Sequence, residues 1–421
     1  MRRRWLRTAL FLAAGALLIL AVAAAWRTSI VGPARALRSD IAARSTARFP
    51  RPPQVEPATP GTFGQHAAMP WETLARLQAG SADVELCRAV RAGEQPFEAL
   101  TPSCVRELQS GAPALDALLE ATHAAEAGPP PGLGTLDAPA PALGGWSTLP
   151  YAARLGALRI RQLLAAGDAA GAARSCVDLQ ALARDASWGT GLSGRLPALG
   201  AEEATFRSCV AALDVLPPGS KPAVGEALRR VEKGTPDFAA VIAEYGLGAR
   251  AQAFAAYLGP LDGLPPQVGQ WARQDAPERP TGWLFALALG DAWHRIDARL
   301  AAAVDAARAP MPGRADRLDR LSAGERPVLN PAAGFALPQL GRMARSDARG
   351  RAQLRLLRAA VAADLLRDRQ GRWPTASELS RELGPSEARA TLGVEPQGEA
   401  ALLVDPDVPR GELAVTIQPD R

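Results

Sequence analysis

Histidine, cysteine and lysine are all scarce in this chain. Its 421 residues include three histidines, four cysteines and two lysines, and aromatic side chains account for only 5%. No C-x-x-C pair occurs, and none of the histidines lies near a cysteine, so the ligand spacing of a typical metal site is missing. We therefore expect neither a metal nor a cofactor, and a core that is mostly aliphatic.

Arginine supplies nearly all of the positive charge, since Lys221 and Lys233 are the only lysines. The formal net charge is only +5, and acidic residues are interspersed with the arginines along most of the chain. A nucleic-acid-binding protein usually concentrates its charge in one basic face with interleaved aromatics. The composition therefore argues against a nucleic-acid partner and favours an ordinary solvated surface.

Long apolar runs are absent except at the N-terminus. The run from Thr8 to Trp26 carries no charge and would span roughly 28 Å as a helix, close to the hydrocarbon thickness of a bilayer. Four arginines precede it, which predicts a cytoplasmic N-terminus. The segment Trp283–Gly290 is the next most apolar, and it is far too short to be a second span.

This run predicts a signal anchor over residues 1–27 and an exported remainder of the chain. The lipid bilayer is then one partner, and the location is the inner membrane with the bulk of the chain in the periplasm. A cleaved signal peptide is the alternative, because Ala23 and Ala25 form an A-x-A-like site. In that case the mature protein would be soluble in the periplasm.

Proline and glycine divide the rest of the chain. Residues 28–70 include six prolines between positions 49 and 70 and predict a Pro-rich tether. Residues 71–370 alternate helical patterns with Pro/Gly punctuation and predict an exported helical domain, with an internal loop at 128–147. Residues 371–421 predict a small cap in which 399–404 and 412–417 pair as a hairpin.

The expected fold is mainly α, an irregular array of stacked hairpins closed by a small C-terminal α/β cap. The clearest hairpin joins helices at 150–165 and 169–186, broken at Gly167 and Asp168. Before this hairpin, helices are expected from Ser81 to about Ala92, from Thr101 onward, and after Pro113 to near Gly128. After it, they are expected at about 198–215, 235–258, 282–308 and 331–370.

The four cysteines form two couples that are local in sequence, Cys87 with Cys104 and Cys176 with Cys209. Export into an oxidising compartment favours disulfides, and this pairing demands least of the fold among the three connectivities. Each bridge would stabilise the fold by about 3 kcal/mol in the chain-entropy model. Four buried free thiols are the alternative.

Residues 189–194 read G-T-G-L-S-G and match the dinucleotide-binding pattern G-x-G-x-x-G. The match follows an expected helix rather than a strand, so we interpret it as a loop between helices. Ser193 with His123 or His294 would make a hydrolase only if the fold brought them together. The sequence gives no reason for that.

Two acidic pairs also invite a functional interpretation. Glu202 and Glu203 would lie in the first turn of an expected helix, where negative charge suits the exposed amides. Asp405 and Asp407 resemble the start of a calcium loop, but Pro409 stands where a ligand is needed, and we predict a hairpin turn. Neither pair predicts a catalytic or metal site.

Arginines recur at helical spacing before the cap and form the one candidate surface for a protein partner or for anionic lipid headgroups. A solvated helix face beside Asp347, Asp364 and Asp368 is the simpler interpretation. The arginines are Arg342, Arg345, Arg349, Arg351, Arg355 and Arg358.

The end of the last long helix shows clear local signals. Gly371 suits the left-handed position after a helix, and Thr375 with Glu378 forms a capping box for a short helix up to Leu383. Helix, Gly-Arg-aromatic-Pro, short helix and a small sheet resemble the body of type II secretion major pseudopilins over residues 350–406. The anchor lacks the pseudopilin Gly cleavage site and its Glu, so pilus assembly is not carried over.

A second resemblance covers most of the exported region. The helical hairpin near the middle, and the tail NPAAGFALPQLGRMARS followed by LRLLRAAVAADLLRDRQGRWP, resemble uncharacterised single-pass helical proteins of bacterial envelopes. This resemblance implies an exported all-helical domain with a small cap, and no activity. The preferred function is a non-catalytic envelope scaffold or adaptor. The alternatives are a hydrolase whose site forms only in three dimensions, and an accessory component of a secretion or pilus-like machine.

Overall fold

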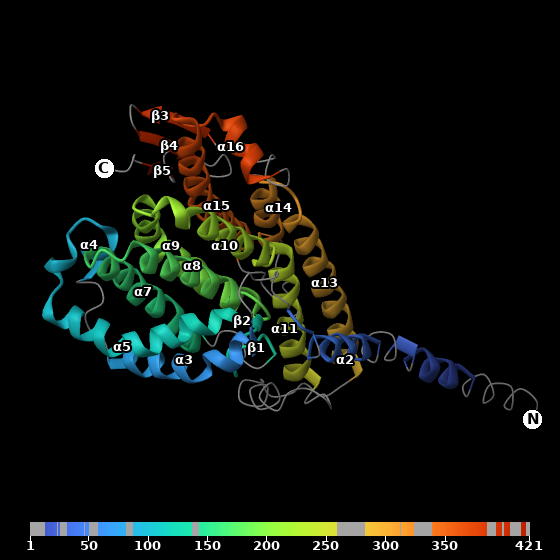
Figure 1. Ribbon diagram of the computed structural model, residues 1–421. Helices are drawn as coiled ribbons and strands as arrows, with labels where there is room; N and C mark the ends of the chain where they lie inside the picture. The colour runs from blue at the N-terminus through green and yellow to red at the C-terminus, as the bar shows by residue number, and fades with distance from the viewer. Residues whose placement is uncertain are drawn as a thin grey trace, which may run out of the picture.

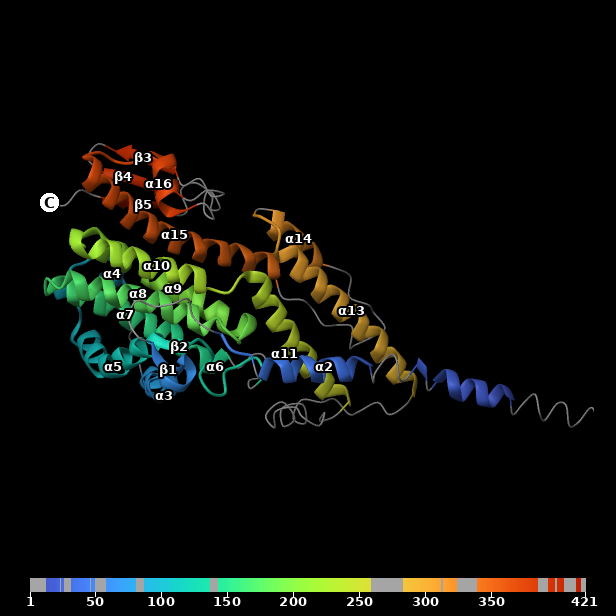
Figure 2. The ribbon, with the colours of Figure 1, turned by 45° about the vertical axis from the view of Figure 1, so that its right-hand side comes forward.

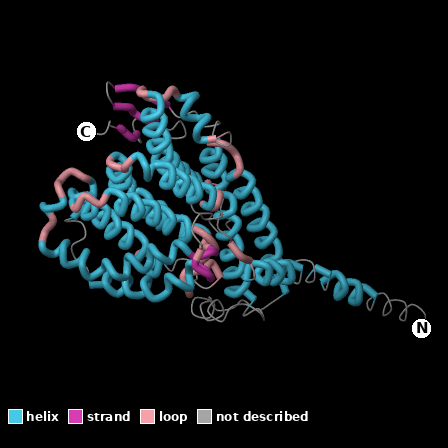
Figure 3. Tube along the Cα trace, viewed as in Figure 1, coloured by secondary structure: helices cyan, strands magenta, loops and turns pink. Residues whose placement is uncertain are grey.

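Helices make up most of the computed structural model (Figure 3). It describes residues 13–22, 24–25, 32–45, 47–49, 58–80, 87–136, 143–258, 283–311, 313–323, 339–384, 393–397, 400–404 and 414–417. The expectation of a mainly α-helical protein is confirmed.

The centre of the fold is a layer of three helices, α7 (Thr148–Ala165), α8 (Ala169–Ala186) and α9 (Gly191–Asp214), which pack on one another. The hairpin between α7 and α8 forms as predicted. Gly167 adopts φ +78°, and Asp168 caps α8 by accepting a hydrogen bond of 2.8 Å from the amide of Gly171. Trp146, Leu149, Tyr151 and Leu182 are among the buried side chains of this core.

A second layer lies on one side of the central one and contains α3 (Phe63–Gly80) and α5 (Pro102–Glu120) (Figures 1 and 2). Just before α3, β1 (Thr59–Thr62) pairs in parallel with β2 (Ala124–Glu126). Phe63 and Ala67 are fully buried in the core. The tether prediction is therefore wrong for residues 58–70, because these apolar side chains anchor the segment despite its prolines.

A third layer covers the opposite side and consists of α10 (Lys221–Gly234) and the long α15 (Leu340–Gln370) (Figure 2). Helix α10 was not predicted, although Val224, Leu228 and Val231 have helical spacing and face the core. Helix α15 reaches Gln370 as expected and ends at Gly371, with φ +69°. The expected start of this helix at 331–338 lies outside the described residues.

The C-terminal cap contains α16 (Ala376–Leu383) and a sheet of three antiparallel strands, β3 (Gly393–Gln397), β4 (Ala400–Val404) and β5 (Ala414–Ile417). The predicted hairpin forms, with Ala401 opposite Ile417. Strand β3 was missed because Pro396 suggests a break. As an edge strand, β3 tolerates the missing amide hydrogen.

A separate helical group stands beside these layers and contains α11 (Phe238–Leu258), α13 (Trp283–Ala307) and α14 (Gly313–Ser322). It has its own core, which includes Ile242, Leu300 and Leu318. Helix α2 (Gly32–Ser45) packs on α11, with Leu37 and Ile41 buried. The part of the predicted tether that forms α2 is thus docked on the body.

The remaining elements are short connections: α4 (Arg88–Ala92), η3 (Phe97–Ala99), η4 (Ala121–His123), α6 (Leu143–Trp146) and η5 (Pro218–Ser220). Helix α6 falls within the expected loop at 128–147, and residues 137–142 of that loop lie outside the described residues.

The N-terminal helix projects away from the body, and Leu17, Leu18, Ile19 and Leu20 are each about two-thirds exposed (Figure 1). Residues 8–12, 23 and 26 of the predicted span are outside the described ranges. Within those ranges, no helix combines the length and apolar character that crossing a bilayer requires.

Candidate functional site

One depression in the described part of the molecule lies between α9 and α15. It has a volume of about 270 Å³ and is open to solvent. Apolar side chains lie on the α9 side, and polar ones come from both helices. The lining residues are Leu196, Leu199, Gly200, Glu203, Ser346, Arg349, Gly350 and Gln353. We call this depression the α9–α15 groove.

Beneath the groove, Arg195 of α9 is fully buried and holds two carboxylates. Its Nη1 lies 2.7 Å from Glu202 Oε1, and its Nε lies 2.8 Å from Asp347 Oδ1 of α15. Asp347 also accepts from Arg351 Nε at 2.9 Å. The charge-assisted hydrogen bond between Arg195 and Asp347 ties the two helices together, while the other two lie within α9 and within α15.

The pairing governs the ionisation of these buried groups. Burial alone would lower the pKa of Arg195, but Glu202 and Asp347 raise it above its ordinary value. Burial alone would raise the pKa of Asp347, but Arg351 and Arg195 hold it below its ordinary value. Arg195 and Asp347 therefore stay charged at neutral pH, and they are not poised to exchange a proton.

Polar contacts also connect α9 and α15 at the rim of the groove. Arg349 of α15 donates two hydrogen bonds to Glu203, at 3.2 and 3.1 Å, and Gln353 donates to the same carboxylate. Glu202 therefore accepts a hydrogen bond from Arg195 within α9, whereas Glu203 accepts from residues of α15. The expectation that Glu202 lies in an exposed first turn is wrong, because α9 starts at Gly191 and Glu202 is 7% exposed.

The helices approach closely where Gly350 faces Glu202. A Cβ at position 350 would lie 2.2 Å from Glu202 Oε2 and 2.7 Å from Leu199 Cδ2. Among the described residues, Glu202 Oε2 and Arg195 Nη2 are buried without a hydrogen-bond partner. The absence of a side chain at Gly350 is thus what lets α15 pass over the buried network.

A second buried cation lies between α10 and α15. Lys221 is 1% exposed and forms ion pairs with Asp364 and, at 3.0 Å, with Asp368. Burial alone would lower the pKa of Lys221, but the hydrogen bonds to both aspartates raise it above its ordinary value. This cluster therefore joins α10 to α15 much as Arg195 joins α9 to α15.

Sequence reasoning missed Arg195, Asp347 and Lys221. The sequence does contain a signal for Arg195. Positions 192, 195, 199 and 202 share one helix face, and Leu192 and Leu199 make this face apolar. Arg195 and Glu202 are charged residues on that buried face, two turns apart, and a charge on a buried face needs a partner of opposite charge. Asp347 could not be assigned to them from sequence, since it lies on another helix.

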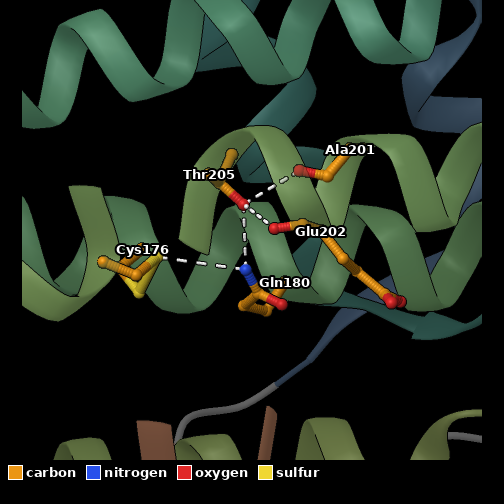
Figure 4. The surroundings of a disulfide bond; sticks show 6 residues. Cys176, Gln180, Ala201, Glu202 and Thr205 are labelled. Carbon is orange, nitrogen blue, oxygen red and sulfur yellow. Dashed lines mark hydrogen bonds between the residues drawn. A yellow bond between two sulfur atoms is a disulfide. The ribbon is translucent and has the colours of Figure 1, made fainter. Parts of the chain in front are cut away.

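The predicted disulfides form, between Cys87 and Cys104 and between Cys176 and Cys209. All four cysteines are buried. Figure 4 shows the second bond beside Gln180, whose Nε2 lies 3.0 Å from Thr205 Oγ1 and 3.9 Å from Cys209 Sγ. Thr205 in turn donates to the α9 backbone at Ala201. The bond therefore joins α8 and α9 inside the main core.

The residues considered for hydrolysis lie on separate elements. Ser193 belongs to the first turn of α9, so the interpretation of residues 191–194 as a loop is wrong. His123, in η4, is 3.0 Å from Asp178 Oδ1 and 3.9 Å from Glu120 Oε1. His294 is an exposed residue of α13. Through these contacts His123 links Glu120 at the end of α5 to Asp178 of α8.

Other candidates fall outside the site. Asp405 and Asp407 lie outside the described residues. In the described ranges, no group of three or more His, Cys, Asp or Glu side chains is placed to hold a metal ion.

Three of the six candidate arginines of α15 bind neighbouring helices. Arg345 pairs with Asp319 of α14 at 3.0 Å, and Arg349 and Arg351 make the contacts given above. Arg358 is 4% exposed and bonds to Glu232 and to the carbonyl of Leu383, so it is not part of a surface. Arg342 is exposed. A partner or lipid surface on these arginines stays a prediction for the exposed members.

Comparison of the chain with protein-family models, with curated proteins and with solved structures gave no match.

Proposed function

We propose that this protein is an exported, membrane-anchored helical scaffold that presents a rigid body and its α9–α15 groove to a protein partner in the envelope. The observation that carries the proposal is the pairing of all four cysteines as disulfides. Such bonds persist in oxidising compartments and are rare in the reducing cytosol. They support an exported body.

The N-terminal segment supports the anchor. Leu17, Leu18, Ile19 and Leu20 are exposed on a helix that projects from the body, where large apolar side chains are costly in water. Burying them in lipid removes that cost. Since α2 follows this helix closely in sequence and packs on α11, the body would be held near the membrane and not at the end of a long flexible linker.

The groove supports a binding role. Leu196 and Leu199 give it an apolar wall, while Glu203 and Arg349 give it charges of both signs at the rim. The buried ion pairs below fix the spacing of α9 and α15. A rigid groove binds with little ordering cost, and its mixed rim suits a peptide or helix with apolar anchors and flanking charges.

Membrane topology tests the first part of the proposal. Alkaline phosphatase and green fluorescent protein would each be fused after Arg421 in a Gram-negative host. We expect an active phosphatase, no fluorescence, and a chain that stays with the membrane after carbonate extraction. A fluorescent fusion with reduced cysteines would contradict export.

Photocrosslinking in cells tests the groove. A photoreactive amino acid would replace Ser346, which is exposed and lines the groove, or Arg174, an exposed residue of α8 outside it. We expect a discrete protein adduct from position 346 and none from position 174. Equal labelling at both positions, or none at position 346, would contradict a partner site there.

A further inference from the structure

Three helices are joined by one arginine at the edge of the body. Arg250 of α11 pairs with Asp40 of α2, Nη2 to Oδ2 at 3.4 Å, and with Asp297 of α13, Nη1 to Oδ1 at 3.6 Å. Asp40, Arg250 and Asp297 therefore lie at the same height along the axes of α2, α11 and α13. We call this height the level of Arg250 and measure distances along each helix from it.

Further contacts fix the helix directions. Arg44 pairs with Glu244 at 2.7 Å, so α2 runs antiparallel to α11. Gly246 lies against Leu300, so α13 also runs antiparallel to α11. Helices α2 and α13 are therefore parallel to each other. Their N-terminal ends, and the C-terminal end of α11, point the same way.

That direction leads toward the N-terminal helix. From the level of Arg250, α2 extends about 12 Å to Gly32, and α13 extends about 21 Å to Trp283, at 1.5 Å per residue. The chain between Ala25 and Gly32 can span at most about 25 Å. In Figures 1 and 2 the N-terminal end of α13 lies close to α2, on the side from which the N-terminal helix projects.

The sequence at this end is strongly apolar. Residues 283–290 of α13 read WLFALALG, and residues 253–258 of α11 read AFAAYL. Trp and Tyr favour the membrane–water interface, where an apolar ring and a polar group are both satisfied. The run in α13 is too short to span a bilayer. Its length and composition suit partial insertion.

We propose that the N-terminal end of α13, together with the C-terminal end of α11, enters the outer interface of the membrane. This inference rests on the proposed anchor and deepens it, since the body then has a second lipid contact. Two contacts fix the tilt of the body, whereas one would leave it free to swing. The occupant is the lipid bilayer, because the anchor holds this end within reach of the bilayer.

Photocrosslinking to lipid in the full chain tests the inference. A photoreactive amino acid would replace Phe285 near the start of α13, or Asp305 near its end, about 30 Å away along the same helix. Asp305 is well exposed, and within the described part of the chain its ion pair is the local one with Arg308, so it is a matched control. Thiol blocking would confirm that both disulfides are intact in each variant.

We expect position 285 to gain the mass of one phospholipid and position 305 to gain none. An adduct from position 285 to the same chain would show that protein covers this end, and would overturn the inference. Absence of a lipid adduct in a chain that is exported and resists carbonate extraction would overturn it while leaving the anchor intact. A chain released by carbonate, or retained in the cytosol, would overturn both proposals together.

Discussion

Arg195 and Asp347 lie 152 positions apart in the chain and share a buried hydrogen bond of 2.8 Å between Nε and Oδ1. Through this contact α9, in the central layer, is joined to α15, which covers it and leads to the cap. Glu202 completes the network on the α9 side. The relative placement of the two helices that form the groove thus depends on three buried charged groups.

Replacing Arg195 with Met tests this dependence. The change removes the positive charge that pairs with the buried carboxylates of Glu202 and Asp347. We therefore expect the free energy of unfolding to fall by about 3–5 kcal/mol. Urea unfolding followed by circular dichroism would measure the loss. Arg207→Met on the same helix is the control, because the Arg207–Glu94 pair is exposed and 3.5 Å apart. That control should change stability by less than about 0.5 kcal/mol. Equal effects would contradict the role given to the buried network.

Two glycines of the groove should respond to alanine in opposite ways. At Gly350 the new Cβ would meet Glu202 Oε2 at 2.2 Å, so we expect Gly350→Ala to destabilise the protein by about 1–3 kcal/mol through overpacking. At Gly200, in the interior of α9, no neighbouring atom of the described residues lies within 4 Å of where the new Cβ would sit, and alanine should stabilise the helix by about 1 kcal/mol. Thermal unfolding of the two variants under one condition measures both. Stabilisation by both changes would contradict the close approach at Gly350.

Much of the helical array could be predicted from the sequence because the signals are local. Asp168 as a cap, Gly371 as a helix end and the capping box at Thr375 need only a few neighbouring residues. The disulfides also followed from short separations. Each of these features is decided within one turn or one hairpin, so tertiary packing had no opportunity to override it.

Other features depend on partners that are distant in sequence. Residues 58–70 look like a proline-rich tether, yet burial of Phe63 and pairing of β1 with β2 give them structure. Gly191 has the positive φ of a turn residue, +56°, but it lies against Tyr245 and begins α9. The groove needs Leu196 of α9 and Arg349 of α15 together. Periodicity in a single helix cannot reveal such a pair.

Removing the disulfides should have unequal effects. In the chain-entropy model the separations of 17 and 33 residues correspond to about 3 kcal/mol for Cys87–Cys104 and about 4 kcal/mol for Cys176–Cys209. The second bond also lies in the main core, whereas the first belongs to a small cluster with Val90 and Leu108. We therefore expect the Cys176→Ala/Cys209→Ala variant to be the less stable of the two.

Urea unfolding of both double variants, with and without reductant, measures the effect of each bond. A variant lacking both bonds should not respond to reductant and serves as the control. If the Cys87→Ala/Cys104→Ala variant proved the less stable, the ranking by loop length and core position would be wrong. The folded wild type should resist reduction until it unfolds, because all four sulfurs are buried.

The capping box of α16 should give the cap a measurable acid dependence. Hydrogen bonds from Arg372 and from the Thr375 amide lower the pKa of Glu378 from 4.5 to about 2. Because the pKa of Glu378 is lower in the folded state, its ionised carboxylate contributes to folding stability, and this contribution is fully present above about pH 4.5. It is lost as the pH falls from there toward 2, because the unfolded chain takes up the proton first. Glutamine at this position keeps a capping-box residue without the titration.

Nuclear magnetic resonance titration of the Glu378 carboxyl carbon should therefore give a midpoint far below that of an ordinary glutamate. The stability difference between wild type and Glu378→Gln should shrink as the pH falls through this range. Arg372→Met is the informative second variant, since it removes the first cause of the shift and leaves the Thr375 amide in place. We expect its Glu378 pKa to return part of the way toward 4.5. An unchanged midpoint in Arg372→Met would assign the shift to the helix cap alone and contradict the part given to the ion pair.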